Sequence, residues 1–227
     1  MEHIGEHFFK KKCKFEEKQR VMTYHISKMA KHISQDHQNR ILNFSRFNMD
    51  DDVFFDFCQD NSHLTIERNA DGTIIIMPPT GTLSGEKNSE ITIDLGNWKR
   101  KNGGHSFDSS TGFTLENTAV RSPDASWMSD ERYKSVEYVE LKKFARITPE
   151  FVVELMSETD SLKDLQEKMD EYMESGVLLG WLINPKTEEV FIYRQDGTIS
   201  KVVGFDNKLS GENILQGFEF DLNLLRK

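Results

Sequence analysis

The sequence has few cysteines and no long hydrophobic run, and each shortage excludes a class of protein. Its 227 residues contain only two cysteines, Cys13 and Cys58, which match neither a disulfide framework nor the spacing of a zinc site. No apolar stretch approaches the roughly 20 residues that a membrane-spanning helix needs. The first residues, MEHIGEHFFKKKCKFEEK, lack the uninterrupted apolar core of a signal peptide. These absences predict a cytoplasmic protein with no membrane span.

Positive charge is also in short supply. The 38 Asp and Glu residues outnumber the 29 Lys and Arg residues, and the formal net charge is -9. That balance argues against a protein whose main task is to coat nucleic acid. Aromatic residues make up 11% of the chain, which is enough to build a hydrophobic core and argues against a disordered chain.

Charge divides the chain into two parts. Residues 1–45 hold nine Lys or Arg and five Asp or Glu, a net +4, which leaves -13 for the rest of the chain. This N-terminal segment contains no proline and no sustained apolar stripe. We therefore predict a basic, histidine-containing extension over residues 1–45, weakly helical or flexible, and one folded domain over residues 46–227.

Hydrophobic patterning predicts alternating strands and helices in the folded domain. Helices are expected over residues 53–58, 84–100 and 161–175. Strands are expected over 64–68, 73–77, 105–107, 112–115, 124–128, 151–156 and 179–183, with a C-terminal hairpin over 190–194 and 198–203. The middle of the chain thus has the order helix, strands, helix, strand, which predicts an α/β fold with a mixed sheet and helices on its faces.

Two acidic residues stand where the pattern is otherwise hydrophobic. Glu154 interrupts the apolar run from Phe151 to Met156, and a strand buried on both faces rarely keeps an ionised group without a partner. Asp124 follows Pro123 at the start of another hydrophobic strand. If the two strands are neighbours, the carboxylates converge at one end of the sheet, where they need a cation or a shared proton. Oxygen ligands of this kind favour a divalent metal, and Mg²⁺ is the natural choice.

Plainer roles are open for the same residues. Glu154 can face solvent on an edge strand, or it can pair with Arg146 or Lys168. Lys168 lies at the edge of the apolar stripe of its helix and can extend back toward the carboxylates, although its acidic neighbours also suit a solvated face. Glu86 and Glu90 are four residues apart on one helix face and can either reach the site or remain on the surface.

Several motifs lie in register at residues 72–81, 107–113, 121–127, 151–155, 167–169, 172 and 180–185. Together they resemble one known family, the Uma-two family of restriction-endonuclease-like proteins, and the likeness covers residues 46–225. The resemblance implies the PD-(D/E)XK nuclease fold, a mixed central sheet flanked by helices, here with an added C-terminal β-hairpin.

The resemblance also implies roles for particular residues. Asp124 belongs to the Pro-Asp element and Glu154 is the second acid, so both are implied as catalytic metal ligands, with the Leu155 backbone carbonyl as a further ligand. The position two residues after Glu154 is Met156 where the usual pattern has a lysine. Lys168, from the next helix, is implied as the substitute.

The same resemblance assigns the acid of the first long helix and an activity. Glu90, or failing that Glu86, is implied as this acid. The implied activity is hydrolysis of phosphodiester bonds in nucleic acid, expected to be DNA, with Mg²⁺ as cofactor and Mn²⁺ as its alternative. Nucleases of this kind often act as dimers, so a homodimer is implied as well. A non-catalytic module of nuclease descent, which binds nucleic acid or a protein partner, is the main alternative, and a phosphoesterase acting on a small nucleotide is the third.

Overall fold

The computed structural model describes residues 40–44 and 49–226 of the chain. Most of the predicted N-terminal extension therefore lies outside the described residues. The exception is strand β1 (Arg40–Asn43), which lies inside the predicted extension and pairs with a strand of the folded domain.

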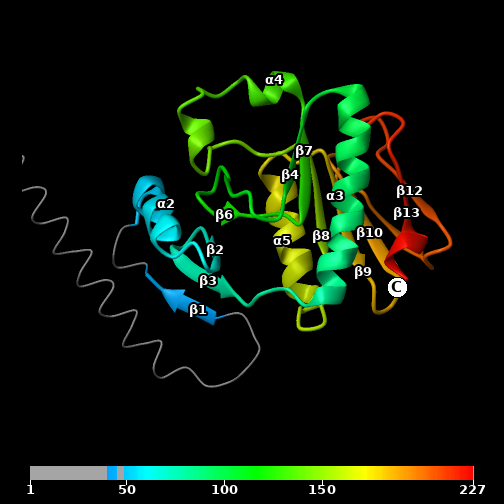
Figure 1. Cartoon of the computed structure of the whole chain (residues 1–227), viewed down its shortest axis with the longest axis horizontal. Helices are drawn as coiled ribbons and strands as arrows, with labels where there is room; N and C mark the ends of the chain where they lie inside the picture. The colour runs from blue at the N-terminus through cyan, green and yellow to red at the C-terminus, as the bar shows by residue number, and fades with distance from the viewer. Residues whose placement is uncertain (1–39, 45–48, 227) are drawn as a thin grey trace, which may run out of the picture. The chain divides into compact units, whose positions relative to one another are not determined.

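Six strands form the central sheet of the domain, in the order β11-β10-β9-β8-β7-β4. Strands β8 and β9 are parallel and the other neighbours are antiparallel, so the sheet is mixed as predicted (Figure 1). Every residue of β8 and β9 is buried, which explains their almost wholly apolar sequences. The strands are β4 (His105–Asp108), β7 (Ala125–Met128), β8 (Phe151–Leu155), β9 (Leu179–Asn184), β10 (Glu189–Arg194) and β11 (Ile199–Val203).

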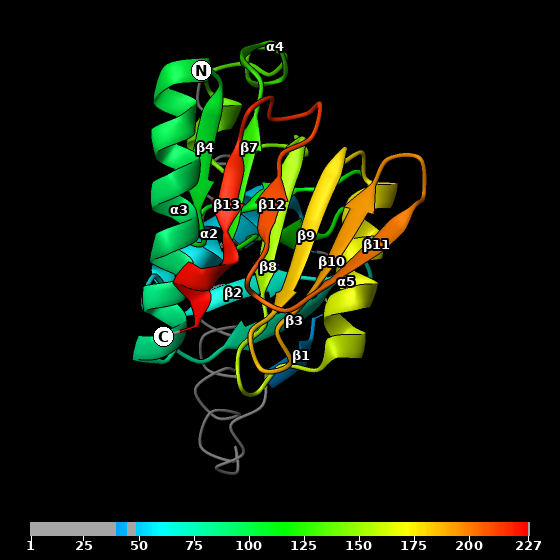
Figure 2. The same ribbon diagram turned by 90° about the vertical axis from the view of Figure 1, so that its right-hand side faces the viewer.

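Helices α3 (Thr82–Asn102) and α5 (Leu162–Glu174) cover opposite faces of this sheet, as Figure 2 shows. Residues Ile91 and Leu95 of α3 pack in one core with Phe151 and Val153, whereas Met169 and Tyr172 of α5 pack in another with Val152. The alternation along β8 sends odd-numbered side chains to α3 and even-numbered ones to α5. Helix α5 begins where expected, because the Ser161 side chain accepts a hydrogen bond from the Asp164 backbone N–H.

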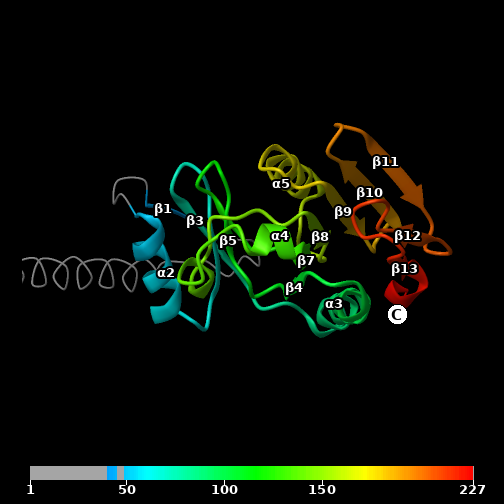
Figure 3. The same cartoon turned by 90° about the horizontal axis from the view of Figure 1, so that it is seen from above.

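A second sheet has the order β1-β3-β2-β6-β5. Its strands β2 (Thr65–Arg68) and β3 (Thr73–Met77) are two of the predicted strands and pair as a hairpin, and β5 (Phe113–Thr114) is the core of the strand predicted over 112–115. Strand β6 (Val120–Arg121) was not predicted, since two residues show no periodicity. Helix α2 (Asp51–Asp60) lies between β1 and β2 in the chain and extends the predicted helix at both ends (Figure 3).

The C-terminal part adds more than the predicted hairpin. Strands β10 and β11 form that hairpin and extend one edge of the central sheet. A further two-stranded sheet follows, and its buried Phe220 joins the core on the α3 side. The remaining elements are β12 (Lys208–Ser210), β13 (Glu219–Asp221), α4 (Asp130–Tyr133) and the 3₁₀ helices η2 (Glu140–Lys142) and η3 (Leu222–Leu225).

The order α3, β4, β7, β8, α5, β9 confirms the predicted core order of the central sheet. The intervening β5 and β6 belong to the second sheet and do not interrupt it. Within the described residues, no helix combines the length and apolar character needed to cross a bilayer.

Candidate active site

Asp124 and Glu154 meet at one end of the central sheet. Asp124 immediately precedes β7, and Glu154 is the fourth residue of the neighbouring β8. The antiparallel register places Ala125 opposite Val153, so Asp124 stands opposite Glu154. Asp124 Oδ2 also accepts a 2.7 Å hydrogen bond from the Leu155 backbone N–H. The convergence predicted from the two strand patterns is therefore present.

Helix α3 reaches this point through Asn88. Its Nδ2 donates a 2.9 Å hydrogen bond to Asp124 Oδ1. Its Oδ1 is buried and has no hydrogen-bond partner in the described part of the chain. Asn88 lies three residues before Ile91 and seven before Leu95, and so it extends the buried stripe of α3 toward the end of the sheet.

The acids expected from α3 lie to either side of this contact in sequence. Glu86 is exposed. Glu90 lies near Asp94, where burial and then the Glu90 charge raise the pKa of Asp94. Asn88 was missed because it is uncharged, although its place on the apolar stripe was visible in the sequence.

Lys168 lies between two buried carboxylates. Its Nζ is 2.9 Å from Glu154 Oε1 and 3.0 Å from Glu67 Oε1, and its side chain is only 15% exposed. The side chain therefore runs from α5 toward the sheet instead of into solvent. This contact matches both the predicted approach to the carboxylates and the plainer ion pair with Glu154. Arg146, the other expected partner of Glu154, pairs with Asp51 at 2.8 Å.

The protonation of Glu154 is shifted by its surroundings. Burial raises the pKa of Glu154 to about 7; the Lys168 charge opposes this shift, and the charges of Asp124 and Glu67 add to it. Tyr172, one turn after Lys168 on α5, donates a 2.9 Å hydrogen bond from its hydroxyl to Glu154 Oε1. Burial likewise raises the pKa of Asp124. Burial thus favours the protonated form of both acids, and a nearby cation would favour their charged form.

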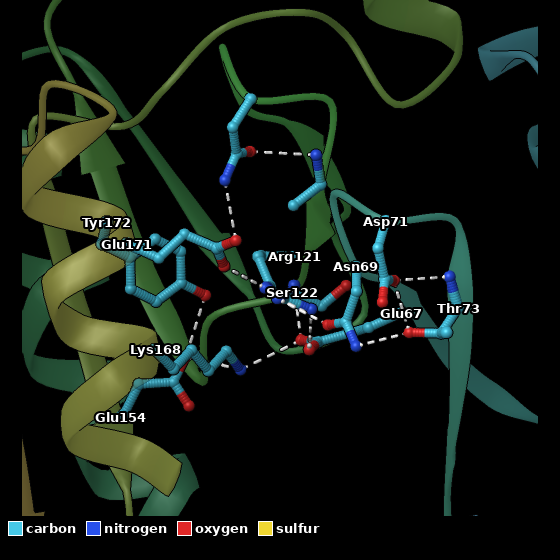
Figure 4. Close-up of polar contacts among 12 residues, drawn as sticks. Glu67, Asn69, Asp71, Thr73, Arg121, Ser122, Glu154, Lys168, Glu171 and Tyr172 are labelled. Carbon is cyan, nitrogen blue, oxygen red and sulfur yellow. Dashed lines mark hydrogen bonds and ion pairs between the residues drawn. The ribbon is translucent and has the colours of Figure 1, made fainter. Parts of the chain in front are cut away.

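Glu67 is a member of the cluster that sequence reasoning missed. It comes from β2 of the second sheet, and its side chain is 4% exposed. Oε1 accepts a 2.9 Å hydrogen bond from the Ser122 backbone N–H, and Oε2 lies 3.4 Å from Arg121 Nη1 (Figure 4). Burial alone would raise the pKa of Glu67, but the charges of Lys168 and Arg121 hold it below its usual range. Glu67 is therefore ionised at neutral pH.

The donor atoms at this end of the sheet suit a hard divalent cation. Among the described residues, no three Asp, Glu, His or Cys side chains are grouped to hold a metal. Mg²⁺, however, is commonly bound through one or two carboxylates and keeps several waters. Asp124 and Glu154 supply the carboxylates, and the partnerless Oδ1 of Asn88 is a third oxygen beside Asp124. The residues present fit such an ion.

Comparison with known proteins identifies the family. The sequence profile of a family described as "Uma2: Putative restriction endonuclease" matches residues 51–224. The chain belongs to the Uma2 family. The match spans Glu67, Asn88, Asp124, Glu154 and Lys168, and so it includes the whole cluster. None of the curated proteins matches the chain.

A solved structure supports the fold of this Uma2 member. It is the crystal structure of "a putative nuclease belonging to DUF820 from Anabaena variabilis", with a TM-score of 0.60 and 18% sequence identity. The likeness covers 71% of the present chain and 89% of that one. The chain therefore has the restriction-endonuclease-like fold that the sequence motifs implied.

Proposed function

We propose that this Uma2 protein is a divalent-metal-dependent endonuclease that hydrolyses phosphodiester bonds in DNA. The observation that carries the proposal is the meeting of Asp124, Glu154 and Lys168 at one end of the sheet. Two buried carboxylates would repel a phosphodiester, so the site makes chemical sense with a cation between protein and substrate. The family description, which names restriction endonucleases, supports the same chemistry.

Asp124, Glu154 and the Asn88 amide oxygen would hold Mg²⁺ or Mn²⁺. The bound ion would lower the pKa of a water molecule and stabilise negative charge on the phosphate oxygens. Asp124 is oriented for this task by two donors, the Leu155 N–H and the Asn88 amide. Glu154 is oriented by Tyr172 and Lys168, and it contributes its full charge once it has lost the proton that burial favours.

Lys168 serves as a charged hydrogen-bond donor. Burial would lower its pKa, but the charges of Glu154 and Glu67 outweigh burial and raise the pKa above its usual value. The ammonium therefore keeps its proton at neutral pH. It can orient an attacking water and offset charge that develops during attack, whereas a general base would need the neutral amine.

A cleavage assay tests the proposal. Purified protein is incubated with supercoiled plasmid, single-stranded DNA, RNA and a mononucleotide, each with Mg²⁺, Mn²⁺ or chelator. We expect metal-dependent nicking of DNA, and we expect Asp124→Asn and Glu154→Gln to reduce its rate by at least about 100-fold, as losing a charge-stabilising group at an active site typically does. Glu158→Gln is the matched control, because Glu158 follows β8 at 76% exposure and pairs with the exposed Lys186.

The same substrates and variants also show which results would refute the proposed function. Equal nicking by the wild type and both site variants would indicate a contaminating nuclease and refute the proposal. Cleavage of the mononucleotide alone would favour the phosphoesterase alternative. Circular dichroism spectra of all variants are compared so that loss of fold is not mistaken for loss of catalysis.

One observation favours a non-catalytic binding module as the second candidate. Lys168 bridges Glu154 and Glu67, so the protein's own ammonium balances part of the site's negative charge. Calorimetric titration with Mn²⁺ separates the two functions. A nuclease should bind Mn²⁺ and lose that binding in Asp124→Asn, whereas a non-catalytic module should bind no Mn²⁺ at this site.

A further inference from the structure

The ammonium of Lys168 is shared between elements of two different sheets. Glu154 belongs to the central sheet, and Glu67 belongs to β2 of the second sheet, 101 residues before Lys168 in sequence. The two Nζ–oxygen distances, 2.9 and 3.0 Å, are nearly equal. Lys168 is therefore held midway between the cluster of the central sheet and a carboxylate outside it (Figure 4).

Glu67 is itself held firmly by its neighbours. Strands β2 and β6 are antiparallel with Arg68 opposite Val120, which brings Glu67 opposite Arg121. The Arg121 guanidinium lies 3.4 Å from Glu67, and it is 9% exposed. Arg121 also donates to Asn69 at 2.8 Å and to Glu171 of α5 at 2.5 Å. With the Ser122 N–H on its other oxygen, the Glu67 carboxylate has little freedom to move.

This arrangement has a consequence for Glu154. A buried ammonium with a single carboxylate partner would pair with it fully and compete with any cation for its oxygens. A second carboxylate, fixed on the opposite side, divides that attraction. The negative charge of Glu67 thus leaves Glu154 free to serve the ion, while Lys168 stays within reach of the site.

We propose that Glu67 is a positioning residue, which anchors Lys168 from the second sheet and so keeps Glu154 available to a divalent cation. The inference rests on the proposed function for its catalytic consequence, but the anchoring itself does not. Arg121 supports the anchor by fixing Glu67. The second sheet is therefore part of the active-site machinery and not only a structural addition.

The test compares Glu67→Gln with Glu171→Gln. Both variants remove a carboxylate from Arg121, but only Glu67 also contacts Lys168. A merely structural role for Glu67 predicts that the two variants behave alike. Glu67→Asp keeps the charge but shortens the reach, so it is expected to fall between the wild type and Glu67→Gln. If Glu67→Gln fails to fold, Glu67→Asp is compared with the wild type in its place.

Three measurements are made on each folded variant. The first is trace labelling of Lys168 by isotopic acetic anhydride, measured by mass spectrometry of its peptide. We expect Glu67→Gln to raise the labelling several-fold, because acetic anhydride reacts with the neutral amine and loss of the Glu67 carboxylate makes it easier for Lys168 to release its proton. Glu171→Gln should leave the labelling unchanged. The second is Mn²⁺ affinity, which we expect Glu67→Gln to weaken about tenfold, within the usual range of coupling between groups in contact. The third is cleavage, where kcat should fall while the KM for DNA stays constant.

A double-variant comparison isolates the mechanism. In a Lys168→Met background no ammonium competes for Glu154, so Glu67→Gln should no longer weaken Mn²⁺ binding. Unchanged Lys168 labelling in Glu67→Gln would overturn the proposal, and so would raised labelling with Mn²⁺ affinity and kcat both unaltered. If the wild type neither binds Mn²⁺ nor cleaves nucleic acid, the proposed function fails, and the labelling comparison alone then decides whether Glu67 anchors Lys168.

Discussion

Removal of the Lys168 ammonium should have a large cost for the stability of the domain. Lys168→Met keeps the length and most of the apolar stem of the side chain but leaves Glu67 and Glu154 facing each other, at 4% and 6% exposure. Removing one partner of a buried pair typically destabilises a protein by about 3–5 kcal/mol, because the remaining charge is neither hydrated nor paired.

The surroundings indicate the lower end of that range. The Lys168 charge lowers the pKa of Glu154, so its loss raises that pKa further above about 7, and Glu154 can then take up a proton instead of staying charged. Glu67 keeps Arg121 as a partner. We therefore expect a loss of about 3 kcal/mol in the free energy of unfolding at pH 8. The loss should shrink below pH 6, where Glu154 is protonated in the wild type as well.

Urea unfolding followed by circular dichroism measures this loss. Lys163→Met is the matched control, because Lys163 is on the same helix, is 82% exposed and pairs with Glu167 only at a distance of 3.4 Å. An exposed pair four residues apart contributes at most about 0.5 kcal/mol. If Lys168→Met and Lys163→Met were equally stable at pH 8, the buried cluster would not depend on Lys168 and the reasoning would be refuted.

Two further predictions concern Glu154 and two glycines. Burial raises the pKa of Glu154 from 4.5 to about 7, so the folded protein holds the Glu154 proton more tightly than the unfolded chain does. In the absence of metal, this proton stabilises the fold fully below pH 4.5, and the stabilisation is lost as the pH rises through 7. Between pH 5 and pH 8, the free energy of unfolding of the wild type, measured with urea in the absence of metal, should therefore fall by about 2 kcal/mol relative to that of Glu154→Gln. If the free energies of unfolding of the two proteins changed with pH in the same way, this pKa would be wrong. Gly96→Ala, in open space on α3, should stabilise by about 1 kcal/mol in the same assay. Gly104→Ala should destabilise, because φ is +77° and a Cβ would lie 2.4 Å from the Trp127 indole; the opposite order of stability would refute this.

The central sheet and its two helices were predictable from the sequence because their patterns are long or strongly apolar. The buried runs of β8 and β9 and the periodic stripes of α3 and α5 specify their structure locally. Strand β6, with two residues, and β12 and β13, with three each, carry no such pattern. Strand β6 forms because β2, a distant segment, pairs with it, whereas β12 and β13 pair with each other. Neither pairing leaves a signal in a window of two or three residues.

The same distinction applies to the site. Asp124, Glu154 and Lys168 could be selected because each breaks or borders an apolar pattern. Glu67 lies in a strand predicted correctly, but its partner Arg121 is 54 residues away in a strand that was not predicted. No local pattern could show that the second sheet would carry a carboxylate to Lys168. Asn88 is different, because its position on the α3 stripe was visible and only its lack of charge hid it.

The position of Lys168 shows how the proposed site could use a lysine that does not come from β8. Side chains at even-numbered positions of β8 face α5, as Val152 does when it packs with Met169 and Tyr172. Glu154 points to the same side, and so would a lysine at position 156, where this chain has Met. A lysine on α5 approaches from the helix that covers this face, so it brings its ammonium to the same side of the sheet. This position also brings the ammonium within reach of Glu67, which connects the second sheet to the proposed active site.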